Sequence, residues 1–290
     1  MILVTGGTGM VGGEILRLLS QAGITATALI RNPQRAPDLT GINWVHGDLA
    51  KPETLPAAFA GSDSVFLVSS IGLDTVELQH NAIEAARDAR VQHIVKLSAF
   101  GASDHSNAPI CQMHYQVEKE MQNSGMEWTI LRPHHFMQNL LSQIPYITRE
   151  GVVYSASGDG KIPYIDASDI AAVAAVTLTK PGHHGKKYVI TGSEALSYRQ
   201  ATEIIGRTIG KPLRFVDESP AESRARRQRE GYSPKILESA LAISAYQRGG
   251  GKTVTITTVV ADLTGRPPRT VAEFARDHAA LFRGSPEGRP

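Results

Sequence analysis

Cysteine is almost absent from this chain, since Cys111 is the only one in 290 residues. A single cysteine excludes an intrachain disulfide and makes a reducing, cytoplasmic setting the natural expectation. Long hydrophobic runs are lacking too, because no apolar stretch approaches the roughly 20 residues that a membrane span needs. Met1 begins the first predicted strand directly, which leaves no room for a signal peptide. We therefore expect a soluble protein inside the cell.

An excess of charge of one sign is also missing. The formal net charge is +2, and 20% of the residues are charged. Such a balance creates no strong field for nucleic acid or for an anionic membrane, so we expect neither as a partner. The one basic run, at 224–229, is interpreted as a solvated helix face. The length allows a large core, either in one α/β domain or in one domain with a smaller lobe.

Glycine is concentrated near the N-terminus. A wholly apolar strand, 1–5, is followed at once by Gly6, Gly9 and Gly12, and then by a helix with apolar residues at helical spacing. In a dinucleotide-binding unit such glycines allow a sharp turn, a close approach to a pyrophosphate and tight packing of helix on strand. The alternative is a purely structural turn. We assign the cofactor contacts of this turn to Gly6, Thr8, Gly9, Met10 and Val11.

The end of the second predicted strand indicates which cofactor is bound. NAD-binding sites usually place an acid there for the ribose hydroxyls, whereas an arginine accommodates the 2′-phosphate of NADP. Arg31 occupies this place, and no carboxylate stands between Thr25 and Pro37. A planar guanidinium suits a phosphate, so the sequence predicts NADP(H). The alternative is an ordinary surface arginine at a strand end.

The order of the predicted elements gives the fold class. Apolar or β-branched runs that predict strands lie at 1–5, 25–30, 43–46, 64–69, 93–97 and 186–191. They alternate with helical patterns, which predicts an α/β fold with a doubly wound parallel Rossmann sheet. Ligands of such sheets lie outside the carboxyl ends of the strands. Val68, Ser69 and Ser70, at the end of the fourth strand, are therefore candidates for the cofactor ribose.

The domain division follows from the same order of elements. We expect an NADP-binding domain over residues 1–150, to which residues 165–192 return. A smaller, mostly helical substrate-side lobe is expected over 193–283. The Gly/Pro-rich residues 284–290 are expected to form a disordered tail.

Several motifs together resemble one known family. They lie at Val4–Gly9, Gly47–Leu49, Asn123–Pro133 and Asp159–Asp169. With these motifs the chain is similar to the atypical short-chain dehydrogenases, and most similar to their NmrA-like branch. That branch includes NADPH-dependent quinone and triphenylmethane-dye reductases as well as redox-sensing regulators. The resemblance runs from Met1 to about Phe282 and implies further cofactor contacts at Asp48, Leu49 and Pro133.

The resemblance also bears on catalysis. Short-chain dehydrogenases generally use a Tyr-x-x-x-Lys pair, and Tyr115 with Lys119 has that spacing. The register of the family motif, however, places its lysine at His114 and its tyrosine at Ile110, so we predict that the pair is absent. His114 is then a candidate ligand of the cofactor ribose or a proton donor, with a structural histidine as the alternative. Ser98 corresponds to the family's active-site serine or threonine and could orient a substrate oxygen.

The segment after Pro133 is expected to form the acceptor site, because in similar reductases it runs past the nicotinamide. Phe136, Met137 and Tyr154 are interpreted as an apolar wall for a flat ring, and Asn139 as its hydrogen-bonding partner. Core packing is the competing interpretation. The neighbouring His134 and His135 diverge in direction and lack further ligands, so no metal site is predicted.

These features together favour an NADP(H)-dependent oxidoreductase that transfers hydride to a small, flat, electron-poor acceptor such as a quinone, an azo dye or a triphenylmethane dye. Reduction of a simple ketone needs a proton donor, whereas a quinone ring spreads the charge that hydride transfer creates. The missing tyrosine therefore fits such acceptors. The rival function is a regulator that senses NADP without turnover and signals to a protein partner. The sequence leaves both this choice and a homodimer open.

Overall fold

The computed structural model describes residues 1–72 and 74–285. Most of the expected disordered tail, from residue 286 onward, lies outside the described residues, as does Leu73, the first residue of one predicted helix. The described chain divides into two compact units, each built from separated segments. The first unit contains Met1–Ser106, Cys111–Pro133 and Ile170–Val189. The second contains Asn107–Ile110, His134–Asp169 and Ile190–Pro290.

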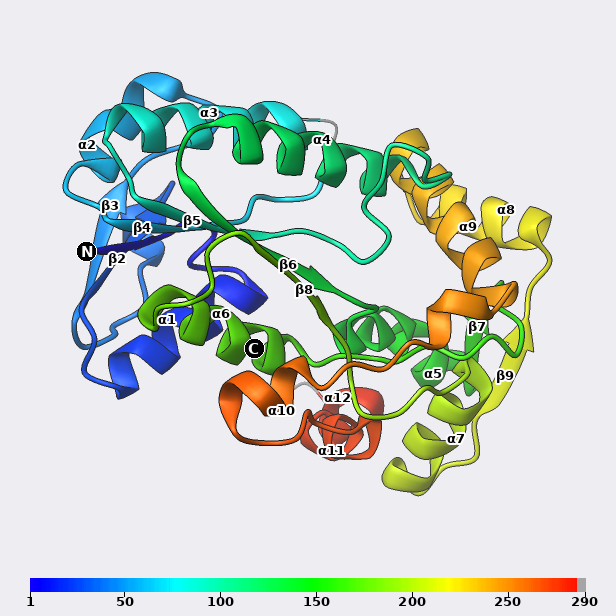
Figure 1. Cartoon of the computed structure of the whole chain (residues 1–290). Coiled ribbons are helices and arrows are strands. Elements are labelled where there is room, and N and C mark those ends of the chain that lie inside the picture. The colour runs from blue at the N-terminus through cyan, green and yellow to red at the C-terminus, as the bar shows by residue number, and fades with distance from the viewer. Residues whose placement is uncertain (73, 286–290) are drawn as a thin grey trace. The chain divides into compact units, whose positions relative to one another are not determined.

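The first unit is organised around a seven-stranded parallel sheet with strand order β3-β2-β1-β4-β5-β6-β8. Its strands are β1 (Ile2–Val4), β2 (Ala26–Ile30), β3 (Ile42–His46), β4 (Ser64–Leu67), β5 (His93–Leu97), β6 (Glu127–Pro133) and β8 (Lys186–Ile190). Its longer helices are α1 (Met10–Gln21), α2 (Leu55–Phe59), α3 (Thr75–Asp88), α4 (Pro109–Asn123) and α6 (Ala167–Thr179). Short 3-10 turns lie at Pro33–Arg35 and Pro52–Thr54. Figure 1 shows α2, α3 and α4 on one face of the sheet and α1 and α6 on the other.

The central strands are buried along their whole length, which is why their sequences are continuous apolar runs rather than alternating ones. Val4 of β1 pairs with Ala28 of β2 on one side and with Phe66 of β4 on the other. Because neighbouring strands are parallel, their carboxyl ends lie along the same edge of the sheet. The predicted α/β fold with a doubly wound parallel Rossmann sheet is confirmed.

The second unit is mostly helical and includes a small sheet that the sequence analysis did not anticipate. Strand β7 (Val152–Ser155) pairs in parallel with β9 (Arg214–Asp217). Its other elements are α5 (Ile144–Glu150), α7 (Tyr198–Ile209), α8 (Pro220–Arg229), α9 (Pro234–Arg248), α10 (Val259–Thr264), α11 (Val271–Asp277), α12 (Ala279–Phe282) and the 3-10 helices at Met137–Gln143 and Gly251–Val254.

The observed division differs from the expected one at residues 134–150, which belong to the second unit rather than to the sheet domain. The reason lies in their packing. Met137, Leu140 and Ile147 are fully buried in an apolar cluster with residues of α7, α11 and α12, including Phe274 and Phe282. Of the expected returning segment 165–192, residues 170–189 belong to the first unit, whereas 165–169 and 190–192 belong to the second.

Within residues 1–72 and 74–285, no helix combines the length and the apolar character that crossing a bilayer requires.

Candidate cofactor-binding and catalytic site

Residues 6–12, called the glycine turn below, connect β1 to α1. Gly6 has a φ of +61°, a conformation that glycine adopts at no steric cost. A Cβ atom on Gly12 would stand 2.3 Å from the Gly6 carbonyl oxygen, so only glycine allows the helix to approach the turn this closely. Two of the three roles expected for these glycines, the sharp turn and the tight helix packing, are therefore visible in the backbone.

The helix start itself is suited to an anion. Gly9 is the N-cap of α1, so no side chain caps the first N–H groups of the helix. The first turn also contains no acidic residue. A helix N-terminus directs N–H groups and the positive end of its dipole toward a phosphate. Gly6, Thr8, Gly9 and Met10 are exposed at this turn. Val11 is only 5% exposed, so its backbone rather than its side chain is available to a ligand.

Thr5 ties the glycine turn to the end of β4. Its hydroxyl oxygen accepts a hydrogen bond from the Val68 amide at 2.8 Å and lies 2.7 Å from the Val68 carbonyl oxygen. A Cβ on Gly6 would meet the Val68 side chain at 2.7 Å. The structure therefore brings the glycine turn and the Val68–Ser70 segment together, as the strand order suggested. Thr5 was overlooked because a buried threonine in an apolar strand gives no distinct signal.

The next two strand ends hold Arg31 and Asp48. Arg31 follows the last residue of β2 and is exposed. Asp48 lies just after β3, and its carboxylate accepts a hydrogen bond from the Ala50 amide at 3.1 Å. The Leu49 carbonyl oxygen accepts one from Asn81 of α3 at 2.8 Å. The Asp48–Leu49 loop is thus fixed by hydrogen bonds at the carboxyl edge of the sheet.

Ser98 follows β5 and is part of a buried polar cluster. Its hydroxyl donates to Glu118 Oε1 at 2.5 Å, and the Glu118 side chain has no exposed surface. Arg132 binds both oxygens of that carboxylate, at 2.9 and 2.5 Å, and Lys187 Nζ lies 3.5 Å from Oε2. In this geometry the Ser98 proton is directed at Glu118, so the hydroxyl could offer a substrate only an acceptor. Pro133, at the end of β6, is buried, and its carbonyl oxygen accepts the Phe100 amide at 2.9 Å.

His114 of α4 is 7% exposed and faces a buried lysine that sequence reasoning missed. Lys96 Nζ lies 3.3 Å from His114 Nδ1 and also donates to Gln79 Oε1 at 2.6 Å and to the Leu97 carbonyl at 3.2 Å. Burial lowers the pKa of Lys96 to about 7, against the opposing attraction of the Glu118 carboxylate. Burial and then the Lys96 charge hold the pKa of His114 well below its usual value. A lysine within a fully buried strand was the available signal.

Tyr115 and Lys119, which have the Tyr-x-x-x-Lys spacing, lie outside the buried stripe of α4. His114, Val117, Glu118 and Met121 form the buried stripe of this helix. Lys119 is exposed and Tyr115 half-buried. Lys119, the lysine of the Tyr-x-x-x-Lys spacing, thus lies in solvent, whereas His114 lies in the buried stripe.

The predicted acceptor residues belong to the second unit and do not form one group. Phe136 is half-buried and forms a β-bridge with Ile165. Asn139 is exposed, and its amide nitrogen lies 3.3 Å from His135 Nε2. Met137 has no exposed surface and lies in the apolar core. Core packing, the competing interpretation, therefore accounts for Met137.

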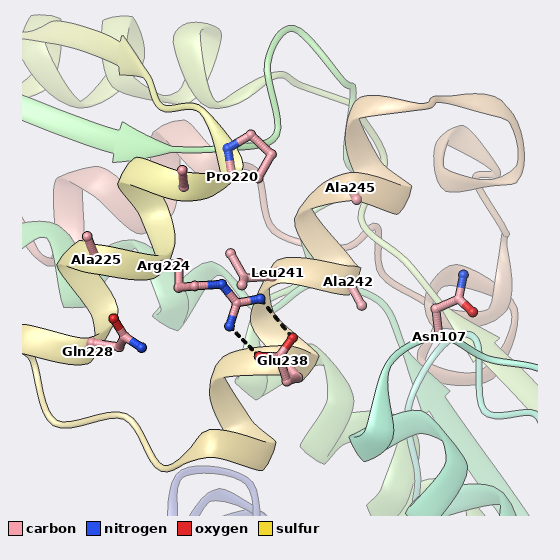
Figure 2. A pocket seen from close by; sticks show the side chains of 10 residues that line it. Asn107, Pro220, Arg224, Ala225, Gln228, Glu238, Leu241, Ala242 and Ala245 are labelled. Carbon is pink, nitrogen blue, oxygen red and sulfur yellow. Dashed lines mark hydrogen bonds and ion pairs between the residues drawn. The ribbon is translucent and has the colours of Figure 1, made fainter.

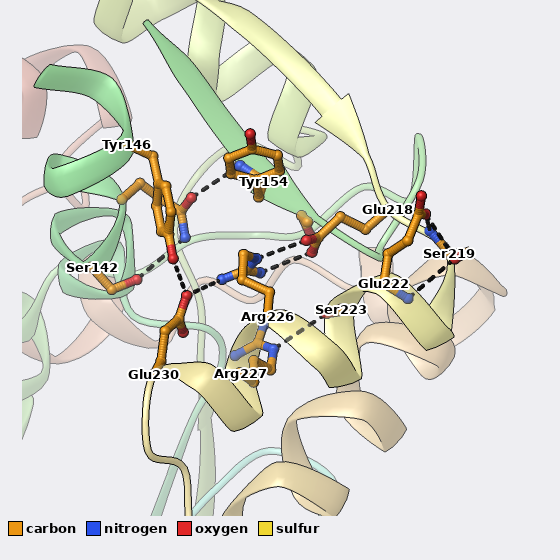
Figure 3. A network of polar contacts seen from close by, with 12 residues as sticks. Ser142, Tyr146, Tyr154, Glu218, Ser219, Glu222, Ser223, Arg226, Arg227 and Glu230 are labelled. Atoms are coloured by element: carbon orange, nitrogen blue, oxygen red, sulfur yellow. Dashed lines mark hydrogen bonds and ion pairs between the residues drawn. The ribbon is translucent and has the colours of Figure 1, made fainter. Parts of the chain in front are cut away.

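Tyr154 is part of a polar network around Arg226 (Figure 3). Its hydroxyl donates to Glu150 at 2.8 Å, and its ring packs edge-on against Tyr146 at 5.1 Å. The Arg226 guanidinium lies 5.5 Å from each of these two ring centroids and binds both oxygens of Glu218, at 2.7 and 2.8 Å. Tyr154 and Phe136 thus have different partners.

The basic run at 224–229 is not simply a solvated face. Arg226 is 7% exposed, because α8 turns it toward the small sheet, where Glu218 and Glu230 bind it. Arg224, by contrast, is exposed and pairs with Glu238 of α9, with Nη2 3.0 Å from Oε2. This pair lies in a groove between α8 and α9 with a volume of about 580 Å³, whose walls carry several alanines. Figure 2 shows the side chains that line it. The expectation of a solvated face is therefore wrong for Arg226.

Among residues 1–72 and 74–285, one group of side chains at the surface has a spacing that could suit a cation. His80, Glu84 and Glu120 place ligand atoms within 4.8 Å of one another. His80 Nδ1 is already 2.6 Å from Glu120 Oε1, as in an ordinary surface ion pair. Exposed acidic groups often lie this close without a metal, so the arrangement alone assigns none.

Comparison with known proteins places the chain among its relatives. It is 39% identical to an NAD(P)H azoreductase of Xenophilus azovorans, with 97% of this chain and 99% of that protein covered. It is 31% identical to quinone oxidoreductase 2 of Escherichia coli, over 94% and 96% of the two chains. The solved structure of an NADPH-dependent quinone oxidoreductase of E. coli in complex with NADPH matches with a TM-score of 0.85 at 28% identity, over 95% of this chain and 98% of that one. The NmrA-like family model matches residues 1–275. The chain belongs to the NmrA-like family.

Proposed function

We propose that this protein is an NADP(H)-dependent oxidoreductase that reduces flat, electron-poor acceptors, namely quinones, azo dyes or triphenylmethane dyes. The observation that carries the proposal is the glycine turn, where the Gly6–Gly12 approach presents the start of α1 at the carboxyl edge of a parallel sheet. That arrangement suits a pyrophosphate. The relatives named as an azoreductase and a quinone oxidoreductase, which match over nearly their whole length, support the type of reaction.

The residues present fit a nicotinamide dinucleotide. Gly6, Thr8, Gly9 and Met10 would hold the pyrophosphate through backbone groups at the turn, with the Val11 amide behind them. Val68, Ser69 and Ser70 would line the ribose side, together with Asp48 and Leu49. When bound and reduced, this cofactor supplies a hydride. NADP(H) is favoured over NAD(H) because Arg31 is exposed at the tip of β2 and can take the 2′-phosphate.

The side chains near the expected nicotinamide position then determine which class of acceptor can be reduced. No tyrosine occupies the family's proton-donor position, where Ile110 stands instead. His114 is neutral at physiological pH, because burial depresses its pKa, and it serves as a hydrogen-bonding ligand of the cofactor ribose or as a weak proton donor. Acceptors whose rings spread the incoming charge need no stronger acid. Phe136, half-buried at its β-bridge, and the exposed Asn139 are the acceptor contacts that we retain.

A turnover assay tests the function directly. Purified protein would be mixed with NADPH and a panel of quinones, azo dyes, triphenylmethane dyes and simple ketones, with no added flavin or metal. We expect steady NADPH oxidation with at least one aromatic class and little or none with ketones. Matched reactions with NADH report the cofactor preference in the same experiment.

The rival function, a regulator that senses NADP, predicts a different result. Such a protein would bind NADPH or NADP⁺ without consuming NADPH with any acceptor. Saturation with NADPH, measured independently by calorimetry, followed by no turnover across the three aromatic classes would overturn the reductase proposal. A protein partner would then be the next object of search.

A further inference from the structure

A chain of four polar side chains runs through the interior of the first unit. Gln79 of α3 donates from Nε2 to Ser69 Oγ at 3.0 Å, and its Oε1 accepts a hydrogen bond from Lys96. Lys96 in turn reaches His114 Nδ1. Gln79 and Lys96 thus link Ser69 to His114, and both of these end residues were predicted from the sequence as site residues. Neither Gln79 nor Lys96 has a role in the proposed function. Lys96 has no exposed surface, and Gln79 is 1% exposed.

The hydrogen-bond capacity of Lys96 is matched to its surroundings. An ammonium group has three N–H donors and no acceptor. Three acceptors surround Nζ, the Gln79 Oε1 at 2.6 Å, the Leu97 carbonyl at 3.2 Å and His114 Nδ1 at 3.3 Å. The charged lysine therefore uses all of its donors, which offsets part of the cost of burying it.

This match has a direct consequence for His114. A neutral imidazole has one nitrogen that donates and one that accepts. Because a charged Lys96 can only donate, Nδ1 must be the acceptor, and the proton of the ring must be on Nε2. His114 then presents one defined group, an Nε2–H donor, to whatever it binds.

We propose that Lys96 is the positioning residue of this site, whose ammonium group fixes His114 as the Nε2–H tautomer and, through Gln79, orients Ser69. The tautomer follows from these contacts while Lys96 is charged, whereas its use in binding the cofactor or the acceptor rests on the proposed function.

The Nε2–H tautomer of His114 is fixed only while Lys96 is charged. The charged groups around it are Glu118 of α4, which attracts it, and the Arg132 and Lys187 side chains that pair with Glu118. Gln79, on α3, is neutral. Since burial brings the pKa of Lys96 to about 7, the ammonium loses its proton in the neutral range. A neutral amine has a lone pair and can accept a hydrogen bond from an Nδ1–H group, so the tautomer is no longer fixed above that pH.

The tautomer can be measured without any assumption about activity. Long-range ¹H–¹⁵N spectra distinguish a protonated ring nitrogen from an unprotonated one, and the His114 signals are identified by their loss in His114→Gln. At pH 6 the unmutated protein should show Nε2 protonated and Nδ1 unprotonated. Protonation on Nδ1 at that pH would overturn the proposal, whatever the protein catalyses.

Lys96→Met tests whether Lys96 is what fixes the tautomer of His114. Methionine has a similar length and no charge, so it fills the buried site. We expect the two His114 tautomers to mix in this variant, and their ratio to lose its dependence on pH between 6 and 9. Lys119→Met, an exposed position on α4, is the matched control and should leave the His114 spectrum unchanged. A single Nε2–H form in Lys96→Met, the same as in the unmutated protein, would refute the role of Lys96.

A pair of His114 variants tests the use of the tautomer. A glutamine amide nitrogen reaches approximately the place of Nε2, whereas an asparagine nitrogen reaches that of Nδ1. We expect His114→Gln to keep NADPH affinity or turnover at least tenfold better than His114→Asn. Equal losses in both variants, with the Nε2–H form present in the unmutated protein, would leave Lys96 as a structural group only and overturn its positioning role. A lack of turnover in the unmutated protein would reject the proposed function instead.

Discussion

Arg132 and Glu118 form a two-point ion pair inside the first unit, with Nε 2.9 Å from Oε1 and Nη2 2.5 Å from Oε2. Because Glu118 has no exposed surface, its removal leaves a partly buried arginine without its countercharge. Glu118→Gln should lower the free energy of unfolding by about 3 kcal/mol, at the low end for buried pairs since Arg132 remains 20% exposed. Urea denaturation measures the change. Glu120→Gln, on the same helix but in a surface pair with His80, should cost at most about 1 kcal/mol; equal costs for the two variants would contradict a special role of Glu118.

Gly12→Ala should reduce both stability and cofactor binding. Its Cβ would stand 2.3 Å from the Gly6 carbonyl oxygen, so α1 must move away from the turn that it shapes. We expect a loss of about 1–3 kcal/mol in the free energy of unfolding, together with weaker NADPH binding. In the control Gly13→Ala the nearest atom is the Gly7 oxygen at 3.2 Å, which a small shift relieves. Thermal melting and NADPH titration of both variants check this prediction. Unchanged stability and NADPH affinity in Gly12→Ala would show that the close approach of Gly12 to Gly6 is not required.

Arg31→Ala tests the choice of cofactor. The unmutated protein should bind NADPH more tightly than NADH, and the variant should lose most of that difference. A charge-assisted contact to phosphate is worth about 1.5–3 kcal/mol, which is roughly a 10- to 100-fold change in affinity. Arg87→Ala is a suitable control, because Arg87 lies in the last turn of α3, just before β5 begins and thus at the opposite edge of the sheet. Equal NADPH and NADH affinities in the unmutated protein would argue against the role of Arg31.

Lys96 should make stability depend on pH in a defined direction. Its pKa is about 7 in the folded protein, compared with 10.5 for an ordinary lysine. Between these values the unfolded chain binds more protons than the folded one, so stability contributed by this group rises with pH, by up to about 1.4 kcal/mol per unit. Below pH 7 both states hold the proton, and the contribution is constant. The difference in unfolding free energy between the unmutated protein and Lys96→Met should therefore shift in favour of the unmutated protein from pH 7 to 9. A constant difference across that range would mean that the folded pKa is not depressed.

Tyr115→Phe should leave turnover within about threefold, because losing a true general acid typically costs 10²- to 10⁴-fold. Tyr115 lies beside the buried stripe of α4, and Lys119, its spacing partner, is exposed. Steady-state kinetics with NADPH and the best quinone measure the effect. A hundredfold loss with unchanged NADPH affinity would restore the conventional tyrosine mechanism.

The features predicted correctly from the sequence are local ones. The glycine turn follows from the spacing of Gly6, Gly9 and Gly12 between a strand and a helix, and the sheet follows from continuous apolar runs. Strand ends such as Arg31 and Ser69 lie where a parallel sheet must put them. In each case the physical cause, a backbone conformation or a hydrophobic period, acts within about twenty residues.

The features that sequence reasoning missed depend on partners far along the chain. Lys96 is held by Gln79 and His114, which come from two different helices. Arg226 looked like one of several surface arginines, because nothing in the run itself shows that Glu218 and two tyrosine rings enclose it. Met137 appeared available to a ligand, but the burial of its side chain depends on helices that begin sixty or more residues later. Such tertiary partners leave no pattern in the local sequence.

The interleaving of the two units has a consequence for synthesis on the ribosome. The sheet of the first unit is complete once Ile190 has emerged. The core of the second unit joins Met137 to Phe282, so it cannot close until nearly the end of the chain is available. At typical translation rates of roughly 5–20 residues per second, the intervening ninety or so residues take about 5–20 s. During that interval the apolar side chains of Met137, Leu140 and Ile147 lack the residues of α11 and α12 that bury them in the finished protein.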